Sequence, residues 1–201
     1  MTMSHVRSGA TRALVVVCLA APAAMAQNPP AAPAAAPPAD ATVVAKPTYV
    51  SIPLEIMVNR PAADVWKRIG KYCGIGEWFR IPCTITQGKE DEFGAVRSVA
   101  NEVLVGKTEL SYTYTQPVRA GRPYDLYHGT LEARPVTATT SKLVYTLVYD
   151  NSMLADDAAR AADRARRVTT FTTALQNMKI LAEGGTLPPA PPRGAGPGRG
   201  N

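Results

Sequence analysis

The side chains of this chain that could carry chemistry are few, and a charged pair stands out among them. Arg97 and Glu102 lie on two neighbouring predicted strands and are expected to meet across the turn between them. A buried pair of this kind could orient the carboxylate or hydroxyl of a bound molecule, or act as acid and base. A purely structural ion pair is the simpler alternative, and the sequence leaves all three open.

Tyrosines accompany this pair on the predicted strands. An aromatic ring offers apolar area, and its hydroxyl can bind a polar group of a ligand. The tyrosines therefore suit the wall of a ligand cavity and suit a closed core equally well. They are Tyr112, Tyr114, Tyr127, Tyr145 and Tyr149.

Other catalytic and metal-binding patterns are missing from the sequence. His128 is the only histidine outside the N-terminal signal, and the alternation of its strand places it on the outer face. One histidine without clustered carboxylates argues against a zinc or iron site. The chain has no Ser-His-Asp set, phosphate-binding loop or dinucleotide glycine fingerprint. We therefore predict no catalytic residue, no metal and no cofactor.

The first 26 residues have the three parts of a secretory signal peptide. Arg7 and Arg12 precede a short apolar run, residues 13–21, and Ala24-Met25-Ala26 is a small-x-small cleavage site. The apolar run is too short to span a bilayer. Cys18 lacks the small preceding residue that a lipoprotein signal requires. We expect cleavage after Ala26, a periplasmic or secreted chain, and no stable membrane insertion after cleavage.

Cys73 and Cys83 are the only cysteines that remain after this cleavage. An even pair in an exported chain is typical of a disulfide. A catalytic thiol is the alternative, but no histidine lies nearby in the sequence. A redox dithiol is a further alternative, although the spacing differs from C-x-x-C. We predict a disulfide that ties a short helical segment to the sheet.

The net charge and its distribution argue against nucleic-acid binding and say little about other functions. The chain has 22 basic and 16 acidic residues, and loss of the two arginines of the signal leaves 20 basic residues and a net charge of +4. The two kinds of charge are interspersed, with no aromatic–basic cluster of the sort that binds nucleic acid. A solvated, mildly basic surface is favoured over attraction to an anionic membrane.

Composition divides the chain into four parts. Residues 27–47 are rich in alanine and proline and have almost nothing to bury, which predicts a disordered linker. Residues 186–201 predict a disordered Pro/Gly-rich tail, with a docking segment as the alternative. Residues 48–185 are then one domain of ordinary size, preceded by the signal peptide at 1–26.

Within this domain the periodicity predicts one strand, two short helices, about six further strands and one long helix. A period of two at Ile52, Leu54, Ile56 and Val58 indicates the first strand. Helical spacing follows from Pro61, with stops at Gly74 and Gly76. Further strands are predicted at 84–86, 93–99, 102–105, 109–115, 124–134 and 143–149, the last covered on both faces. Short turns make them an antiparallel meander.

The last predicted element is a helix over 156–182. Its apolar stripe is mostly alanine in the first half, which leaves room beneath it, and its arginine run is expected to be solvated. Asp156–Arg160 and Asp163–Arg167 are predicted i,i+4 pairs. The stripe consists of Ala161, Ala165, Val168, Phe171, Leu175, Met178 and Ala182.

This order of elements resembles the START-like, birch-pollen-allergen-like superfamily (SRPBCC), in particular its polyketide cyclase/dehydrase and lipid-transport branch. The paired cysteines look like an exported bacterial subset of that branch. The resemblance covers the whole folded part, and no single motif is specific. It rests on residues 59–66, Trp78, residues 94–97, Glu102, residues 110–112 and residues 127–131.

The resemblance implies an α+β helix-grip fold, in which a curved antiparallel sheet of about seven strands wraps a long C-terminal helix. A deep cavity between helix and sheet is implied as well, but the family supplies no catalytic motif to transfer. The residues expected to bind a ligand there are Trp78, Phe79, Arg97, Glu102, Tyr112, Tyr114, Tyr127, Tyr145, Phe171 and Leu175.

Three functions remain in view. The first is a periplasmic binding or carrier protein for a hydrophobic or amphipathic small molecule, lipid-like or polyketide-like, with the segment at Trp78 and Phe79 as its gate. The second is an enzyme of the cyclase, dehydratase or hydrolase kind, with tyrosines or the Arg97–Glu102 pair as acid and base. The third is a non-enzymatic accessory to a periplasmic protein partner.

Overall fold

The structure is a computed structural model and describes residues 46–189. The predicted signal peptide, most of the predicted linker and the last part of the predicted tail lie outside these residues. The elements in chain order are β1 (Tyr49–Val58), α1 (Ala62–Ile69), a 3-10 helix η1 (Tyr72–Gly74), α2 (Ile75–Trp78), β2 (Ile85–Gln87), β3 (Val96–Arg97), β4 (Glu102–Thr108), β5 (Ser111–Thr115), β6 (Asp125–Pro135), β7 (Ser141–Asp150) and α3 (Asp157–Ala182).

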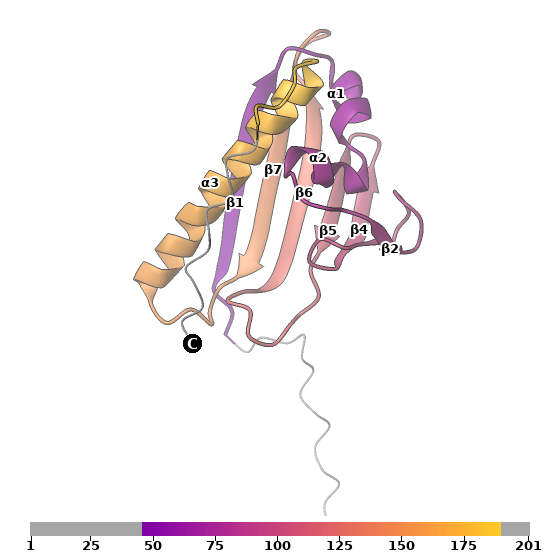
Figure 1. Cartoon of the computed structure of the whole chain (residues 1–201). Coiled ribbons are helices and arrows are strands. Elements are labelled where there is room, and N and C mark those ends of the chain that lie inside the picture. The colour runs from indigo at the N-terminus through magenta and orange to yellow at the C-terminus, as the bar shows by residue number, and fades with distance from the viewer. Residues whose placement is uncertain (1–45, 190–201) are drawn as a thin grey trace, which may run out of the picture. The chain divides into compact units, whose positions relative to one another are not determined.

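The strands form one antiparallel sheet in the order β1-β7-β6-β5-β4-β3-β2. The last strand, β7, therefore pairs with the first strand, β1. Strands β2 to β7 pair in sequence order as a meander. The long helix α3 runs along β1 and β7, while α1 and α2 lie on the same side of the sheet (Figure 1). This arrangement is the predicted helix-grip architecture with seven strands.

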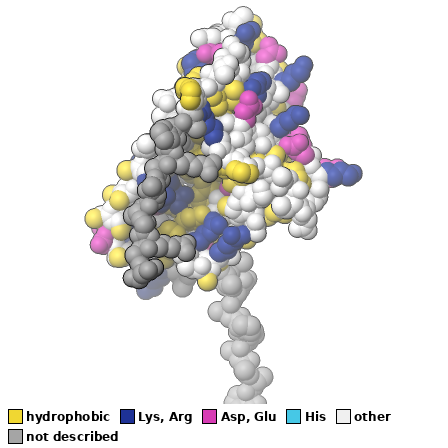
Figure 2. Space-filling view, viewed as in Figure 1, with side chains coloured by type: hydrophobic (Ala, Val, Ile, Leu, Met, Phe, Trp, Pro, Cys, Tyr) yellow, Lys and Arg dark blue, Asp and Glu magenta, His cyan; other side chains and the backbone are white. Residues whose placement is uncertain are grey.

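The core fills the space between this face of the sheet and the helices. Inward residues of β6 and β7 alternate as predicted, with Tyr127, Leu131 and Tyr145 almost fully buried. The prediction that β7 is covered on both faces was wrong. Val148 on its outer face is 37% exposed, because no helix packs on that side of the described domain. Basic and acidic side chains are interspersed on the face seen in Figure 2.

The first helix ends earlier than the sequence suggested. It stops at Ile69 rather than at Gly74, and the chain continues as η1 and α2. Gly70 lies against the indole of Trp66, where a Cβ would come within 2.4 Å of a ring carbon. Only glycine fits beside the ring here. The helix ends because the next residue, Lys71, takes an extended conformation with ψ 140°.

The predicted strand at 93–99 is also shorter. Only Val96 and Arg97 pair with β4, because both flanks take left-handed backbone conformations. Gly94 has φ +81°, and Ala100 and Asn101 have φ +53° and +55°. The tight turn at this second flank sets Arg97 directly opposite Glu102 in the register.

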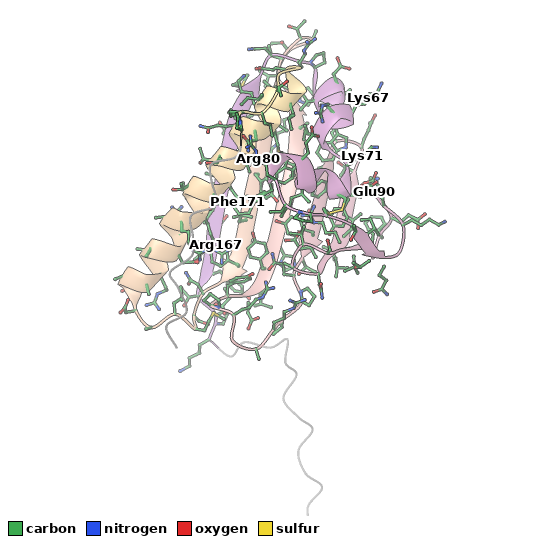
Figure 3. All side chains as sticks on the ribbon, in the orientation of Figure 1. Lys67, Lys71, Arg80, Glu90, Arg167 and Phe171 are labelled. Atoms are coloured by element: carbon green, nitrogen blue, oxygen red, sulfur yellow. A yellow bond between two sulfur atoms is a disulfide. The ribbon has the colours of Figure 1, made fainter. Side chains whose placement is uncertain are left out.

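The largest correction concerns the first half of α3. The predicted inward alanines, Ala161 and Ala165, are exposed, and Asp163 and Arg167 are buried in their place. Arg167 is therefore not part of a solvated arginine face. The second half follows the prediction, with Phe171 buried towards the sheet (Figure 3). The two charges can enter the core because they neutralise each other.

The predicted disulfide between Cys73 and Cys83 is present, with Cα atoms 5.6 Å apart. Its sulfurs close a loop that contains α2, so we call the segment 73–83 the lip. The carboxylate of Glu77 on the lip accepts hydrogen bonds from both terminal guanidinium nitrogens of Arg68 on α1, at 2.6 and 2.7 Å. The disulfide thus joins the two ends of the lip to each other, and an ion pair attaches the lip to α1.

Replacing both cysteines, Cys73→Ser with Cys83→Ser, is expected to lower the free energy of unfolding by about 2.5–3 kcal/mol, because the unfolded chain regains the freedom of the short loop. Urea unfolding of the oxidised chain and of the double variant measures this difference. Intact-mass analysis of the oxidised chain should show two hydrogens fewer than the sequence mass. Two alkylatable thiols in the purified protein would contradict the pairing.

Candidate functional site

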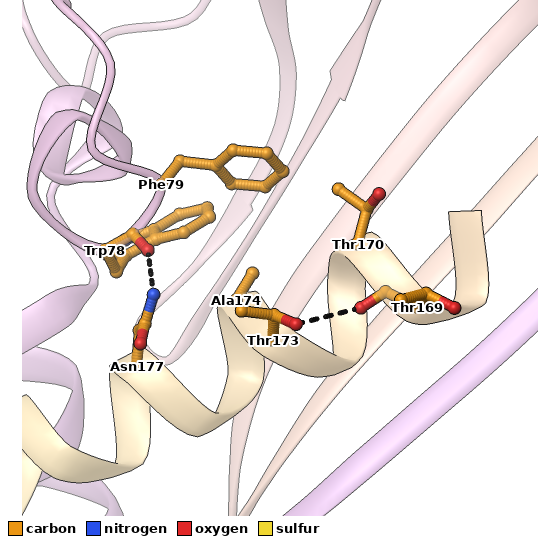
Figure 4. A pocket seen from close by; sticks show the side chains of 7 residues that line it. All are labelled: Trp78, Phe79, Thr169, Thr170, Thr173, Ala174 and Asn177. Atoms are coloured by element: carbon orange, nitrogen blue, oxygen red, sulfur yellow. Dashed lines mark hydrogen bonds between the residues drawn. The ribbon is translucent and has the colours of Figure 1, made fainter. Parts of the chain in front are cut away.

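A groove of about 310 Å³ lies between the lip and the middle of α3 (Figure 4). The lip contributes two aromatic residues. The other five come from successive turns of α3, on one side of that helix. The floor is apolar and one wall bears hydroxyl groups. The lining residues are Trp78, Phe79, Thr169, Thr170, Thr173, Ala174 and Asn177.

Aromatic packing and one hydrogen bond hold the lip against α3. The side-chain amide of Asn177 donates to the carbonyl of Trp78 at 2.9 Å. The ring of Phe79 stands edge-on to that of Phe171, with centroids 5.4 Å apart, and a tilted contact of the same length joins Phe79 to Trp78. Such aromatic pairs add to burial and orient the rings that line the groove.

The threonine wall exposes methyl groups and oxygen lone pairs. Thr169, Thr170 and Thr173 each donate their hydroxyl proton to the carbonyl one turn earlier, at 2.9–3.1 Å. This bond within the helix satisfies the hydroxyl donors without a ligand. The wall therefore adds little polarity, although it comes from residues that are usually polar.

A second groove of about 300 Å³ continues from the first. The two share Phe79, Thr173 and Asn177, and the second is completed by Arg80, Pro188 and Pro189. A guanidinium nitrogen of Arg80 donates to the carbonyl of Pro188. Leu187, just before these prolines, packs against the core. Leu187 and Pro188, in the first part of the predicted tail, thus lie against the domain.

The predicted pair of Arg97 and Glu102 exists and is buried, with side chains 0% and 4% exposed. Arg97 Nε donates to Glu102 at 2.6 Å, and its Nη1 donates to the carbonyl of Tyr72 at 2.5 Å. The other oxygen of Glu102 accepts from Gln116 at 2.7 Å, and Gln116 accepts from Arg122 at 2.6 Å. A chain of hydrogen bonds therefore links η1 to the loop after β5.

Tyrosine rings surround this guanidinium. Its carbon lies 4.4 Å from the ring centre of Tyr72 and 4.6 Å from that of Tyr114. The hydroxyls of Tyr114 and Tyr145 are hydrogen-bonded at 2.9 Å, and burial raises the pKa of both phenols well above the usual value. Gly129 makes room, since a Cβ there would lie 2.4 Å from the Tyr114 ring.

A second buried charge cluster lies at the start of α3. Asp163 accepts from Arg167 Nε at 2.8 Å and from the hydroxyl of Tyr149 at 3.0 Å. The guanidinium of Arg167 stacks on Tyr149 and Tyr124, 4.2 and 4.5 Å from the ring centres. Burial and the bond to Asp163 raise the pKa of Tyr149 to about 12. Cation–π contacts and a carboxylate thus compensate for burying this arginine.

The residues predicted to bind a ligand divide into two groups. Trp78 and Phe79 line the groove, and Phe171 lies directly behind Phe79. The others pack with one another in the core and do not line either groove, and their role in binding stays a prediction. These are Arg97, Glu102, Tyr112, Tyr114, Tyr127, Tyr145 and Leu175.

Several groove residues were not predicted from sequence. The threonines of α3, with Ala174 and Asn177, border the buried stripe of that helix and so occupy the position of a groove edge. The run Thr169-Thr170 and Thr172-Thr173 was a signal, since threonine is not a favoured residue inside helices. His128 is exposed as predicted, and its Nδ1 lies 3.0 Å from the carbonyl of Leu126. Residues 46–189 contain no group of three metal-ligating side chains.

Removing Arg97 should cost more stability than removing the whole pair. Arg97→Leu leaves the Glu102 carboxylate buried without its cation, and we expect a loss of about 3–5 kcal/mol in the free energy of unfolding. The double variant Arg97→Leu/Glu102→Leu should recover at least half of that loss. Urea unfolding at pH 7 measures both. A loss below about 1 kcal/mol in the single variant would show that water reaches the site.

The Asp163 cluster predicts a stability change in acid. Burial raises the pKa of Asp163, but hydrogen bonds from Arg167 and Tyr149 outweigh it and hold the pKa below the usual range. Its stabilisation is therefore complete above about pH 3.9, the value in unfolded chains, and is lost as pH falls through the lower folded pKa.

Urea unfolding between pH 5 and pH 2 tests this. The difference in stability between the wild type and Asp163→Asn should shrink as pH falls through this range. Asp157→Asn, which removes an exposed carboxylate from the same helix, is the matched control. A difference that stays constant down to pH 2 would contradict the role of the ionised carboxylate.

Comparison with known proteins places the fold. No family model and no curated protein matches the sequence. A protein from Thermobifida fusca, solved by NMR, has a TM-score of 0.55 and 22% identity over 66% of this chain and 92% of its own. A protein from Nitrosospira multiformis gives 0.54 and 20% over 65% and 94%.

The third comparison is the Zhui aromatase/cyclase from a Streptomyces species, with a TM-score of 0.52 and 18% identity over 69% of this chain and all of that one. At these identities the likeness shows the fold alone. The seven-stranded sheet, the short helices after β1 and the long C-terminal helix are the elements of that fold. The chain therefore has the helix-grip fold.

Proposed function

We propose that this protein binds and carries a hydrophobic or amphipathic small molecule, lipid-like or polyketide-like, in the groove between the lip and α3. The observation that carries the proposal is the groove itself, of about 310 Å³ and floored by Trp78, Phe79 and Ala174. Sites for small ligands are concave, largely apolar and begin at about 300 Å³. The first groove is therefore large enough for a small ligand, and the second extends it.

Burial of apolar surface would supply most of the affinity. Each Å² of apolar ligand surface removed from water contributes about 25 cal/mol. The ring of Phe79 gives rigid contact area and loses little conformational freedom on binding, because its packing on Trp78 and Phe171 already fixes it. Trp78 is itself 1% exposed and supports Phe79 from within the core. The crosslinked lip supports this preorganisation.

The composition of the groove favours binding over catalysis. None of the seven side chains that line the first groove is a carboxylate, an imidazole, an amine or a thiol. General acid–base chemistry needs such a group within hydrogen-bond reach of the substrate. The Arg97–Glu102 pair of the enzyme hypothesis is buried, with both Glu102 oxygens and two of the three Arg97 nitrogens hydrogen-bonded within the protein, and it lines neither groove. The cyclase or hydrolase reading is therefore the weaker one.

The disulfide supports an exported protein, because such bonds persist in oxidising compartments. Among the described helices, none has the length and apolar character needed to cross a membrane. Together with the signal pattern in the first 26 residues, these observations support a periplasmic location for the carrier.

Filling the groove tests the proposal. Thr173 lines both grooves, so Thr173→Trp is expected to weaken binding of the neutral apolar dye N-phenyl-1-naphthylamine at least tenfold, measured by dye fluorescence. Thr172→Trp adds the same bulk to the neighbouring exposed position, which lines neither groove, and should leave the affinity unchanged. Equal dye affinity in all three proteins would place the binding site elsewhere, and no dye binding would count against the proposal.

A further inference from the structure

We propose that the groove takes an amphiphile with an anionic head group, a carboxylate or a phosphate, and that Arg80 binds this head. The inference rests on the proposed function and names the class of its ligand. It begins from the position of one side chain. Arg80 directly follows the groove residue Phe79 and lines the second groove together with Thr173 and Asn177.

Arg80 has no carboxylate partner among the described residues. Of the other buried or half-buried arginines, Arg97 pairs with Glu102, Arg160 with Asp157 and Arg167 with Asp163. Arg122 has no ion pair in this part of the chain either, but its guanidinium donates to Gln116 and to the hydroxyl of Tyr124. Half-buried Arg80 forms no ion pair within residues 46–189. A guanidinium taken partly out of water without an anion is costly, so the site is complementary to one.

The only polar partner of this guanidinium among the described residues is a neutral one. One nitrogen of Arg80 donates to the carbonyl of Pro188, which leaves most of its five N–H donors without a protein acceptor in residues 46–189. A carboxylate or phosphate would accept two of these donors side by side, and such charge-assisted bonds are roughly twice as strong as neutral ones. Arg80 therefore has donors left for an anionic head beside its bond to the Pro188 carbonyl.

The backbone holds Arg80 in a conformation that directs it to this place. Its φ of +56° lies in the left-handed region, which side chains other than glycine adopt at a cost. The turn that contains it closes the lip, where the N–H of Ile81 donates to the carbonyl of Gly76 at 3.2 Å. Figure 3 shows Arg80 beside α3.

The two grooves together match one molecule with two ends. The first is lined by aromatic rings, methyl groups and Ala174, and the second, which shares Phe79, Thr173 and Asn177 with it, brings in the cation. An apolar chain lying along Phe79 would place its head at Arg80. A neutral amphiphile would fill the same apolar part and gain nothing from the guanidinium.

Three ligands of equal chain length separate these contributions: dodecanoate, dodecyl phosphate and 1-dodecanol, each below its micelle concentration. Isothermal titration of the exported full chain at low salt should show the two anions binding at least tenfold more tightly than the alcohol. Arg80→Gln should remove this preference and leave the alcohol affinity unchanged. Arg80→Lys should keep part of it. Arg119→Gln removes one charge from an exposed site and should change nothing.

The outcomes distinguish this inference from the proposed function. Equal affinity for the anions and the alcohol overturns the role of Arg80 and leaves the carrier proposal intact, while binding of none of the three contradicts both. Equal weakening of all three ligands by Arg80→Gln overturns the inference too, because the side chain would then only support the lip. A stronger preference for dodecyl phosphate points to a lipid phosphate, and one for dodecanoate to a free fatty acid.

Discussion

The structure depends on the burial of one positive charge. The guanidinium of Arg97 joins β3 to β4 through Glu102 and reaches the carbonyl of Tyr72, immediately before Cys73. It thereby positions the beginning of the lip on the sheet. The tyrosine rings around it do not neutralise the charge but offer it their electron-rich faces. Because the cation cannot be left unpaired in this interior, the arrangement of β3, β4 and η1 is fixed together.

The same interior explains why the groove lies at the lip. Rings fill the space between sheet and helix in a continuous series of contacts from Tyr112 through Tyr114 and Tyr127 to Tyr149. Two charge clusters complete this filling, one at each end of the series. Because these side chains fill the interior, the groove lies where the lip meets α3. There Phe79 packs on Trp78 and Phe171 and also borders the groove.

The fold was predictable from the sequence to a large extent, and the groove only in part. Alternation along the strands and the order of elements were enough for the sheet and for α3. The inward face of α3 was assigned wrongly at Ala161 and Ala165, because hydropathy treats Asp163 and Arg167 as solvated. Their mutual neutralisation is a tertiary property, although their i,i+4 spacing in phase with Phe171 was visible. The partnership of Arg80 and Pro188 joins residues 108 positions apart, and no local pattern reveals it.

The disulfide makes the structure of the groove depend on the redox conditions of the compartment that holds the chain. Since the crosslink that steadies the lip forms only under oxidising conditions, a newly made chain in a reducing cytosol would have a loose lip and an incomplete groove. If the chain is exported and carries an amphiphile as proposed, it would hold the amphiphile poorly before export and would arrive empty on the far side of the membrane. Maturation of the site would then coincide with export, which would restrict loading to molecules already present in the destination compartment.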